Sequence, residues 1–304
     1  MIRTTSLTKR FGRILAVDAV DLDVREGDIY GFLGANGSGK TTTVRMLLGL
    51  VLPTAGEVTL LGRPMPSSAG EVLPQVGALV EGPAAYPQLS GRRNLAVFDA
   101  AGAVRRDGRR SRRRRIEEAL DRVGLGGIDG RPVRAYSLGM RQRLGLAAAV
   151  MRSPRLLVLD EPTNGLDPQG IGEIRTLLRE LHAGGTTIML LSHQLAEVEQ
   201  LCSRVGVLDR GRLVLQQGLD EICGPTGRVH LRTPDADRAR AVLDGQVEAV
   251  TATGLLVRHR DPGELNATLV AQGIRVEELT PERRTLEDAV LAATSAGSDR
   301  VARP

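Results

Sequence analysis

The stretch Gly34–Thr41, with the sequence GANGSGKT, decides the fold because it fits the phosphate-binding pattern G-x-x-x-x-G-K-[ST]. A strand-like run at Asp28–Leu33 precedes it and a helical pattern at Thr41–Leu48 follows it, which is the context that the pattern requires. Glycines allow backbone N–H groups to turn inward around a phosphate, and the start of the helix adds partial positive charge. We therefore expect the Lys40 ammonium to neutralise the β- and γ-phosphates of a nucleotide and the Thr41 hydroxyl to bind Mg²⁺.

Two carboxylates end an apolar run further along the chain, at Leu156–Glu161 (LLVLDE). In a parallel sheet the carboxyl ends of the strands meet at the edge where α/β proteins bind their ligands. Asp160 is expected to hold Mg²⁺ there, directly or through water, and Glu161 to polarise the water that attacks the nucleotide. A turn at the end of a strand would explain the two carboxylates equally well in isolation. The upstream phosphate-binding loop is what favours a P-loop nucleoside triphosphatase.

Short apolar runs alternate with helical patterns as far as about residue 218, which predicts an α/β fold with a mainly parallel sheet. The continuously apolar runs Leu156–Leu159 and Ile188–Leu191 are typical of strands that helices cover on both faces. Strand signals disappear between about residues 89 and 150, where we predict an inserted helical subdomain. Its predicted helices are Arg92–Val104, Arg112–Val123 and Gly139–Val150, and the other predicted strands and helices include Gly56–Leu61, Val76–Val80, Gln169–Leu181, Thr186–Leu191 and Leu195–Leu201.

A small accessory domain is predicted over residues 223–304, so that the nucleotide-binding domain covers residues 1–222. The stretch Gly224–Gly227 (GPTG) is expected to be a linker. The pattern that follows has the βαββαβ order of a ferredoxin-like α+β domain. Its elements are predicted at Arg228–Arg232, Ala236–Leu243, Val247–Thr251, Gly254–Arg258, Pro262–Gln272 and Ile274–Leu279. A last helix is predicted from its N-cap Thr285 to about Ala293, with Asp288 completing the cap.

Composition limits the functions open to this chain of 304 residues. No apolar run approaches the ~18–20 residues of a membrane span, so we expect a cytoplasmic protein whose membrane role depends on a partner. Much of the net charge of +5 lies in Arg105–Arg115, which we interpret as a solvated helix start or loop, or as a contact with anionic lipid or a partner. Aromatic residues make up 2% of the chain and none interleaves with these arginines, so we expect no nucleic acid partner. The two cysteines, Cys202 and Cys223, predict no disulfide framework.

The segment Tyr136–Arg143 (YSLGMRQR) resembles the signature sequence of the ATP-binding cassette (ABC) ATPases, whose usual form is L-S-G-G-Q followed by a basic-Gln-Arg run. Ser137 and Gly139 fall on the Ser and the second Gly of that form, whereas Leu138 replaces its first Gly and Met140 its Gln. The resemblance implies that Ser137 and Gly139 cap the γ-phosphate held by the other copy in a dimer. Taken alone, the segment could also be a plain helix N-cap.

Three further segments match the same family in order along the chain. Phe11 lies where the family stacks an aromatic ring on adenine, although a core role for this residue is an alternative. Asn164–Asp167 resembles the loop that crosses to the partner subunit. His193 follows an apolar strand and resembles the switch histidine, which contacts the γ-phosphate and orients the catalytic carboxylate.

One position departs from the usual family pattern. After the strand at Val76–Val80 the family usually has Gln, which ligates Mg²⁺ and transmits motion to the membrane subunit, and this chain has Glu81. A carboxylate can also ligate Mg²⁺. The variant is similar to the branch of the family that exports antibiotics and lantibiotic-type peptides.

The resemblance implies an ATPase that uses ATP and Mg²⁺. Its catalytic residues are expected to be Lys40, Glu161 and His193, and its Mg²⁺ ligands Thr41, Glu81 and Asp160. The residues expected to bind ATP are Phe11, Gly34, Ala35, Asn36, Gly37, Ser38, Gly39, Lys40, Thr41 and Thr42, with Ser137 and Gly139 of the second copy.

The resemblance also implies partners. Two copies are expected to form a head-to-tail homodimer around two Mg·ATP, peripheral on the cytoplasmic face of the membrane through a separate transmembrane permease. An importer ATPase with the same chemistry is one alternative. A soluble ABC ATPase that acts on ribosomes or DNA is another, which the single cassette and the short spacing between Glu81 and Ser137 disfavour.

Overall fold

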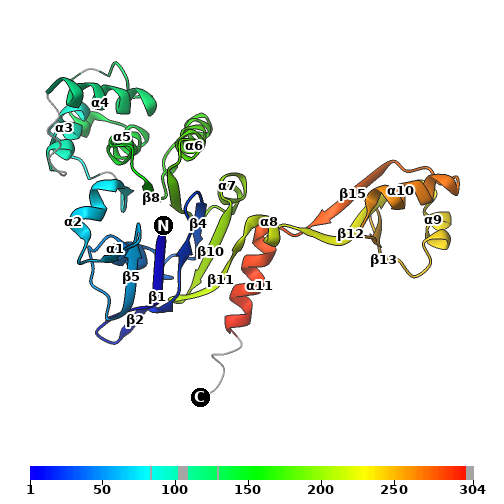
Figure 1. The fold of residues 1–304 in the computed structure, drawn as a ribbon. Helices are drawn as coiled ribbons and strands as arrows, with labels where there is room; N and C mark the ends of the chain where they lie inside the picture. The colour runs from blue at the N-terminus through cyan, green and yellow to red at the C-terminus, as the bar shows by residue number, and fades with distance from the viewer. Residues whose placement is uncertain (83, 102–108, 129, 299–304) are drawn as a thin grey trace. The chain divides into compact units, whose positions relative to one another are not determined.

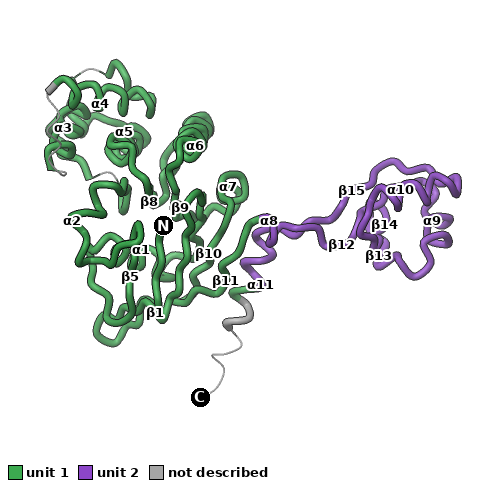
Figure 2. Tube along the Cα trace, in the orientation of Figure 1, with its two compact units in different colours: residues 1–219, 293–304 green, residues 220–292 purple. Residues whose placement is uncertain are grey.

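The computed structural model describes residues 1–82, 84–101, 109–128 and 130–298, and the chain divides into two compact units (Figure 1). The first unit comprises Met1–Leu219 and the end of the chain from Ala293, and the second comprises Asp220–Ala292 (Figure 2). The division falls shortly before the predicted boundary between residues 222 and 223. The end of the last helix groups with the first unit instead of the second.

The first unit is built around a six-stranded sheet in the order β11-β10-β4-β9-β8-β7. Every neighbouring pair from β10 to β7 is parallel, and only the edge pair β10–β11 is antiparallel, which confirms the predicted mainly parallel sheet. All residues of β4 and β9 are buried, as expected for central strands of a sheet that is covered on both faces. The strands are β4 (Ile29–Leu33), β7 (Val76–Leu79), β8 (Leu156–Asp160), β9 (Thr187–Leu191), β10 (Arg204–Asp209) and β11 (Arg212–Gly218).

The first unit also contains a second, antiparallel sheet, and only one of its strands, at Gly56–Leu61, was predicted from the sequence. Its strands are β1 (Ile2–Phe11), β2 (Ile14–Val20), β3 (Asp23–Val24), β5 (Ala55–Leu60) and β6 (Arg63–Met65). The strand expected at Gly56–Leu61 is present as β5, but it pairs with β1 and β6 here and not with the parallel strands. Apolar residues of both sheets, among them Leu7, Phe32 and Leu60, form one buried core.

The helices of the first unit fall close to their predicted positions. Around the sheet lie α1 (Lys40–Leu47), α2 (Ala69–Val72), the 3-10 turn η1 (Leu73–Gln75), α6 (Pro168–Ala183) and α7 (Leu195–Leu201). The inserted subdomain contains α3 (Gly91–Ala101), α4 (Arg109–Arg122), the 3-10 turn η2 (Val133–Ala135) and α5 (Leu138–Val150), grouped together in Figure 1. The end of the helix predicted at Arg92–Val104 and the start of the run Arg105–Arg115 lie outside the described residues.

The second unit has the predicted βαββαβ order. After α8 (Leu219–Ile222) come β12 (Pro225–Arg232), α9 (Ala236–Val242), β13 (Val247–Thr251), β14 (Gly254–Arg258), α10 (Pro262–Ala271), β15 (Glu278–Arg283) and α11 (Leu286–Ser298). Its four strands form an antiparallel sheet in the order β13-β14-β12-β15, which confirms the ferredoxin-like plan. It has a hydrophobic core of its own that includes Val229, Leu231, Val257 and Leu269.

Two predictions for the second unit were wrong. The last strand begins at Glu278 and not at Ile274: Ile274 is buried in the core, and Arg275 N–H instead donates to the Asp235 carboxylate at 3.0 Å. The polar run that does form β15 contains Pro281, which an edge strand accommodates because its missing N–H faces away from the sheet. The predicted linker at Gly224–Gly227 is mostly part of strand β12, which starts at Pro225.

Among the described residues, no helix has both the length and the apolar character needed to cross a membrane.

Candidate functional site

The phosphate-binding loop joins β4 to α1 at the carboxyl edge of the parallel sheet. The backbone φ values are 155° at Gly34, 81° at Gly37 and 106° at Gly39, and residues with a Cβ rarely adopt such values. A Cβ on Gly34 would lie 2.3 Å from the Leu208 carbonyl oxygen, and one on Gly39 would lie 2.4 Å from that of Ala16. The left-handed backbone therefore favours glycine at all three positions, and close packing against neighbouring carbonyls also excludes a side chain at Gly34 and Gly39.

Lys40 lies within the phosphate-binding loop, where it is expected to neutralise the phosphates of a nucleotide. Its side chain is buried, and Nζ donates to the carbonyl oxygens of Gly34 at 2.5 Å and Ala35 at 3.1 Å. Burial lowers the pKa of Lys40, and the charges of Glu161 and Asp160 partly oppose that effect. The ammonium is thus held in a poorly solvated place, where a phosphate chain would complete its neutralisation.

The loop also contains a buried polar side chain, that of Ser38. The hydroxyl of Ser38 is buried and has no hydrogen-bond partner there. The residue itself is well anchored, because its carbonyl accepts from Gly211 N at 2.8 Å and its N–H donates to Ala35 O at 3.1 Å. A phosphate oxygen would satisfy this hydroxyl, so the loop fits a nucleoside triphosphate. Thr41 and Thr42 follow in the first turn of α1 and are half-buried.

Asp160 and Glu161 stand at the end of β8, beside the loop, as predicted from their position in the sequence. Burial and the neighbouring charge of Glu161 raise the pKa of Asp160, whereas a hydrogen bond from the backbone of Glu81 and the charge of Lys40 lower it. Two carboxylates and one ammonium therefore meet in one partly desolvated place. A divalent cation would remove the repulsion between the two acids.

Glu161 has an unusual backbone conformation, and the two oxygens of its carboxylate differ in their hydrogen bonding. Its φ is 48°, a left-handed conformation that is uncommon for residues other than glycine. Oε1 accepts from the backbone N of His193 at 3.0 Å and lies 2.6 Å from His193 Nδ1. Oε2 is buried and has no partner among the described residues. The structure thus brings the predicted base and the predicted switch histidine together and leaves one oxygen able to accept a proton from water.

Three side chains that had no predicted role fix the segment around Glu161. Gln142 on α5 donates through Nε2 to the Glu161 carbonyl at 2.9 Å. Thr163 Oγ1 donates to Glu197 of α7 at 3.0 Å, and both residues are buried. These contacts join residues far apart in the chain, so the only local signal was a polar side chain within an otherwise helical pattern.

Glu81 is near the carboxylates, but its side chain points to a different partner. It also has a left-handed φ, of 59°, and its backbone N–H donates to the Asp160 carboxylate. Its own carboxylate is about half exposed and forms an ion pair with Arg45 at 2.5 Å. Among the described residues no three His, Cys, Asp or Glu side chains gather at one point. That limited ligand set suits Mg²⁺, which is usually bound by one or two carboxylates together with phosphate oxygens and water.

The remaining predicted residues lie on exposed surfaces. Phe11, at the end of β1, is 46% exposed, and Lys9 Nζ lies 4.9 Å from the centre of its ring. Ser137 caps α5, with its hydroxyl accepting from Met140 N at 3.2 Å. Leu138 is 53% exposed and lies beside Gly165, in the loop between β8 and α6. Phe11 is therefore not a core residue, and the start of α5 is open to a second molecule.

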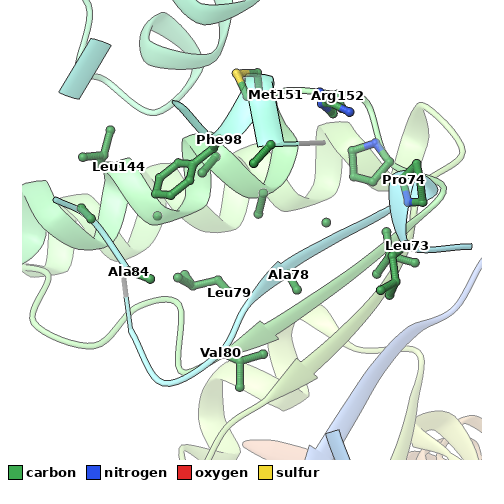
Figure 3. A pocket seen from close by; sticks show the side chains of 18 of the residues that line it. Leu73, Pro74, Ala78, Leu79, Val80, Ala84, Phe98, Leu144, Met151 and Arg152 are labelled. Atoms are coloured by element: carbon green, nitrogen blue, oxygen red, sulfur yellow. The ribbon is translucent and has the colours of Figure 1, made fainter. Parts of the chain in front are cut away.

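An apolar groove of about 650 Å³ lies between β7 and the helical subdomain (Figure 3). Ala78 and Leu79 of β7 form one wall, and Phe98 of α3 and Leu144 of α5 form another. The groove reaches Val80 and Gly82, the two neighbours of Glu81. It is therefore continuous along the backbone with the residue that bonds to Asp160.

Comparisons with known proteins agree with this geometry. The ABC transporter family profile matches residues 17–164. The bacitracin transport ATP-binding protein BcrA of Bacillus licheniformis is 38% identical over 95% of each chain. The daunorubicin resistance ATP-binding protein DrrA3 of Streptomyces coeruleorubidus is 38% identical over 96% of this chain and 94% of its own. The lantibiotic transport ATP-binding protein SrtF of Streptococcus pyogenes is 38% identical over 72% of this chain and 92% of its own.

Solved structures show the same fold in the first unit. The ATP-binding cassette MJ0796, in its dimeric post-hydrolysis state with ADP and Pi, is 25% identical and superimposes with a TM-score of 0.65 over 72% of this chain and 99% of its own. The ATP-binding subunit of another ABC transporter is 26% identical, with a TM-score of 0.67 over 73% of this chain and 91% of its own. The chain belongs to the ATP-binding subunits of the ABC transporters, and its enzymatic class is that of an ABC ATPase.

Proposed function

We propose that this chain is the ATP-hydrolysing subunit of an ABC exporter for antibiotics or antimicrobial peptides. The observation that carries the proposal is the similarity to bacitracin and daunorubicin proteins over almost the whole of both chains. That similarity includes the second unit, which the superimposed cassettes do not cover in full. The likeness therefore extends beyond the nucleotide-binding core that different ABC proteins share.

The residues around the loop can each be given a part in hydrolysis. Lys40 stabilises the charge that develops on the β- and γ-phosphates, and Glu161 takes the proton of the attacking water through its unpartnered oxygen. His193 holds the other oxygen of Glu161 and orients it. Bound Mg²⁺, held by Thr41 and Asp160 and by Glu81 once its carboxylate leaves Arg45, would neutralise phosphate charge. Phe11 supplies an exposed ring for the adenine.

The active form is proposed to be a homodimer with two ATP molecules at its interface. Ser137 and Gly139 begin α5 at an exposed surface, where the helix N-terminus favours an anion. In this arrangement each copy presents that surface to the γ-phosphate held by the loop of the other copy. The dimeric structures of the MJ0796 cassette, to which the first unit is similar, support this arrangement.

The apolar groove beside Glu81 is proposed to receive a segment of a separate permease. Its walls come from both the sheet and the helical subdomain, so a segment seated there would respond to movement between them. Glu81 joins the groove to the nucleotide site through its backbone bond to Asp160. Through this connection, binding and loss of the γ-phosphate would be transmitted to the membrane partner.

Affinity purification of the tagged chain from its native membranes tests the proposal. We expect a polytopic membrane protein to co-purify with the wild type. Phe98→Asp, which places a charge in the groove, should lose that protein and keep ATP turnover. Val97→Asp is the matched control, since Val97 lies next to it on α3, is 37% exposed and does not line the groove. Recovery of ribosomes or DNA in place of a membrane protein would assign the chain to the soluble class.

A further inference from the structure

Arginine dominates the helical subdomain. Between residues 89 and 135 the sequence has 13 arginines, no lysine and six acidic residues, whereas the whole chain has a net charge of only +5. The excess in this one segment is larger than the charge of the whole molecule, so the rest of the chain is slightly acidic. The positive charge is concentrated in one place and is not a general property of the surface.

Part of this charge lies on the outer side of α4. Apolar side chains such as Ile116 and Leu120 bury the inner side against the subdomain. Arg110, Arg113 and Arg114 are exposed on the outer side, and we call these three residues the arginine face. Arg110 and Arg113 form no ion pair with any described residue. Among the described residues, Arg114 pairs with one carboxylate, that of Glu118 on its own helix, at 3.5 Å and in an exposed position.

Other arginines of the subdomain have a structural role that the arginine face does not share. The carboxylate of Asp99 is 2% exposed and forms ion pairs with Arg112 at 2.9 Å, Arg115 at 3.2 Å and Arg152 at 3.3 Å. Burial would raise the pKa of Asp99, but the hydrogen bonds from Arg112 and Arg115 hold it below its usual value. This ion-pair cluster links α3, α4 and the end of α5. The arginine face can thus be changed without disturbing it.

Helix stability does not explain the arginine face. The first turn of α4 has no acidic residue and contains Arg110, near the positive end of the helix dipole. Glu117, Glu118 and Asp121 lie in the second half, nearer the negative end. The opposite order of charges would favour the helix. An arrangement that works against the helix indicates that the arginines serve contact with something outside it.

The position of α4 identifies what that partner can be. Met151 and Arg152 line the apolar groove, and they also line a recess of about 220 Å³ together with Arg115 and Arg122 of α4. The helix therefore adjoins the groove in which we seat the permease, and this step rests on the proposed function. A permease held there would keep α4 close to the membrane that it spans, where anionic headgroups are the abundant negative charges.

We propose that the arginine face binds anionic phospholipid headgroups and gives the ATPase a membrane contact separate from its permease. Each basic residue near an anionic surface contributes about fivefold in affinity. Loss of three arginines should then weaken binding on the order of a hundredfold. The contact should weaken as salt is added, because charges at a surface are screened beyond about 8 Å at physiological ionic strength.

Flotation of the purified full chain with lipid vesicles, without permease, tests this proposal. We expect binding that increases with the fraction of phosphatidylglycerol in phosphatidylcholine vesicles and is lost in the triple variant Arg110→Gln, Arg113→Gln and Arg114→Gln. The matched control replaces Arg238, Arg240 and Arg283 by Gln, which removes the same charge from exposed positions of the second unit. ATP turnover should be unchanged in both triple variants.

Three results would overturn the proposal. They are no binding to phosphatidylglycerol vesicles, equal loss of binding in both triple variants, and displacement from the vesicles by nucleic acid at lower concentrations than by anionic lipid. Since the vesicles contain no permease, such a result leaves the purification experiment on the permease unaffected. The two proposals can therefore fail separately.

Discussion

The partly buried charge of Asp160 in the nucleotide site lowers the stability of the ligand-free protein. Burial and the adjacent Glu161 raise its pKa, so its charged form is less favourable in the folded chain than in the unfolded chain. A raised folded pKa means that the folded chain binds the proton more tightly. The charge of Asp160 therefore destabilises the ligand-free protein once the pH exceeds the unfolded value of about 3.9.

The variant Asp160→Asn tests this account. Without nucleotide it should unfold at a higher temperature than the wild type at neutral pH. The difference should shrink as the pH falls below about 4, because Asp160 then becomes protonated in both states. The same variant should lose most of the stabilisation that Mg·ATP gives the wild type. Thermal unfolding across a pH series measures both effects, and an Asn variant less stable than the wild type at neutral pH would contradict the account.

Other residues of the site could not be predicted, because they act through contacts with residues that are distant in the sequence. The pattern at Gly34–Thr41 specifies its chemistry locally, since the glycines, the lysine and the threonine act within one loop. Gln142 and Glu197 act on the segment after β8 from other helices. Nothing in their own neighbourhood in the sequence distinguishes them from ordinary polar residues of a helix.

At the scale of elements, the contact between α7 and the loop after β8 can be tested separately. Glu197→Ala removes the acceptor of Thr163 Oγ1 and leaves a buried hydroxyl without a partner. We expect a loss of about 1–3 kcal/mol in the free energy of unfolding and a lower kcat, with little change in ATP affinity. Glu197→Gln keeps an acceptor oxygen and should restore most of the kcat. Urea unfolding and steady-state kinetics provide the measurements, and full turnover by the Ala variant would show that the contact is unimportant.

The strands were predicted more accurately where more of their surface is buried. The strands β4, β8 and β9 were predicted to within a residue because burial on both faces makes their sequences continuously apolar. The strands β1 and β2 were missed because each is only partly buried: the exposed side of β1 carries Arg3, Thr5 and Arg10, and β2 begins at the exposed Ile14. The strand β15 was misplaced for a related reason, since it is a polar edge strand that contains Pro281. Burial on one face alone leaves a weaker pattern in the sequence.

At the scale of the whole molecule, the two units each have a core of their own. The nucleotide site lies wholly within the first unit, whereas the second is organised around Val229, Leu231, Leu265 and Leu269. The second unit contributes no residue to the phosphate-binding loop or to the carboxylates beside it. Nucleotide binding should therefore act on the stability of the first unit alone.

Calorimetry can test this independence. We expect two unfolding transitions, of which only one rises in temperature when Mg·ATP is added. A ligand at a hundred times its Kd stabilises by about 2.7 kcal/mol. A domain of roughly 200 residues should then unfold several degrees higher, at about 2–4 °C for each kcal/mol. A non-hydrolysing variant such as Glu161→Gln should be used so that ATP persists. A single transition, or an equal shift of both, would show that the units unfold together.

The central claim is that Glu161 activates water in an ATP-bound homodimer, and light scattering of Glu161→Gln with Mg·ATP tests it most directly. The account predicts that this variant binds ATP, does not hydrolyse it and accumulates as a dimer. Lys40→Ala should neither turn over ATP nor form the dimer. Hydrolysis by Glu161→Gln at the wild-type rate, or a monomer at saturating ATP, would contradict the account.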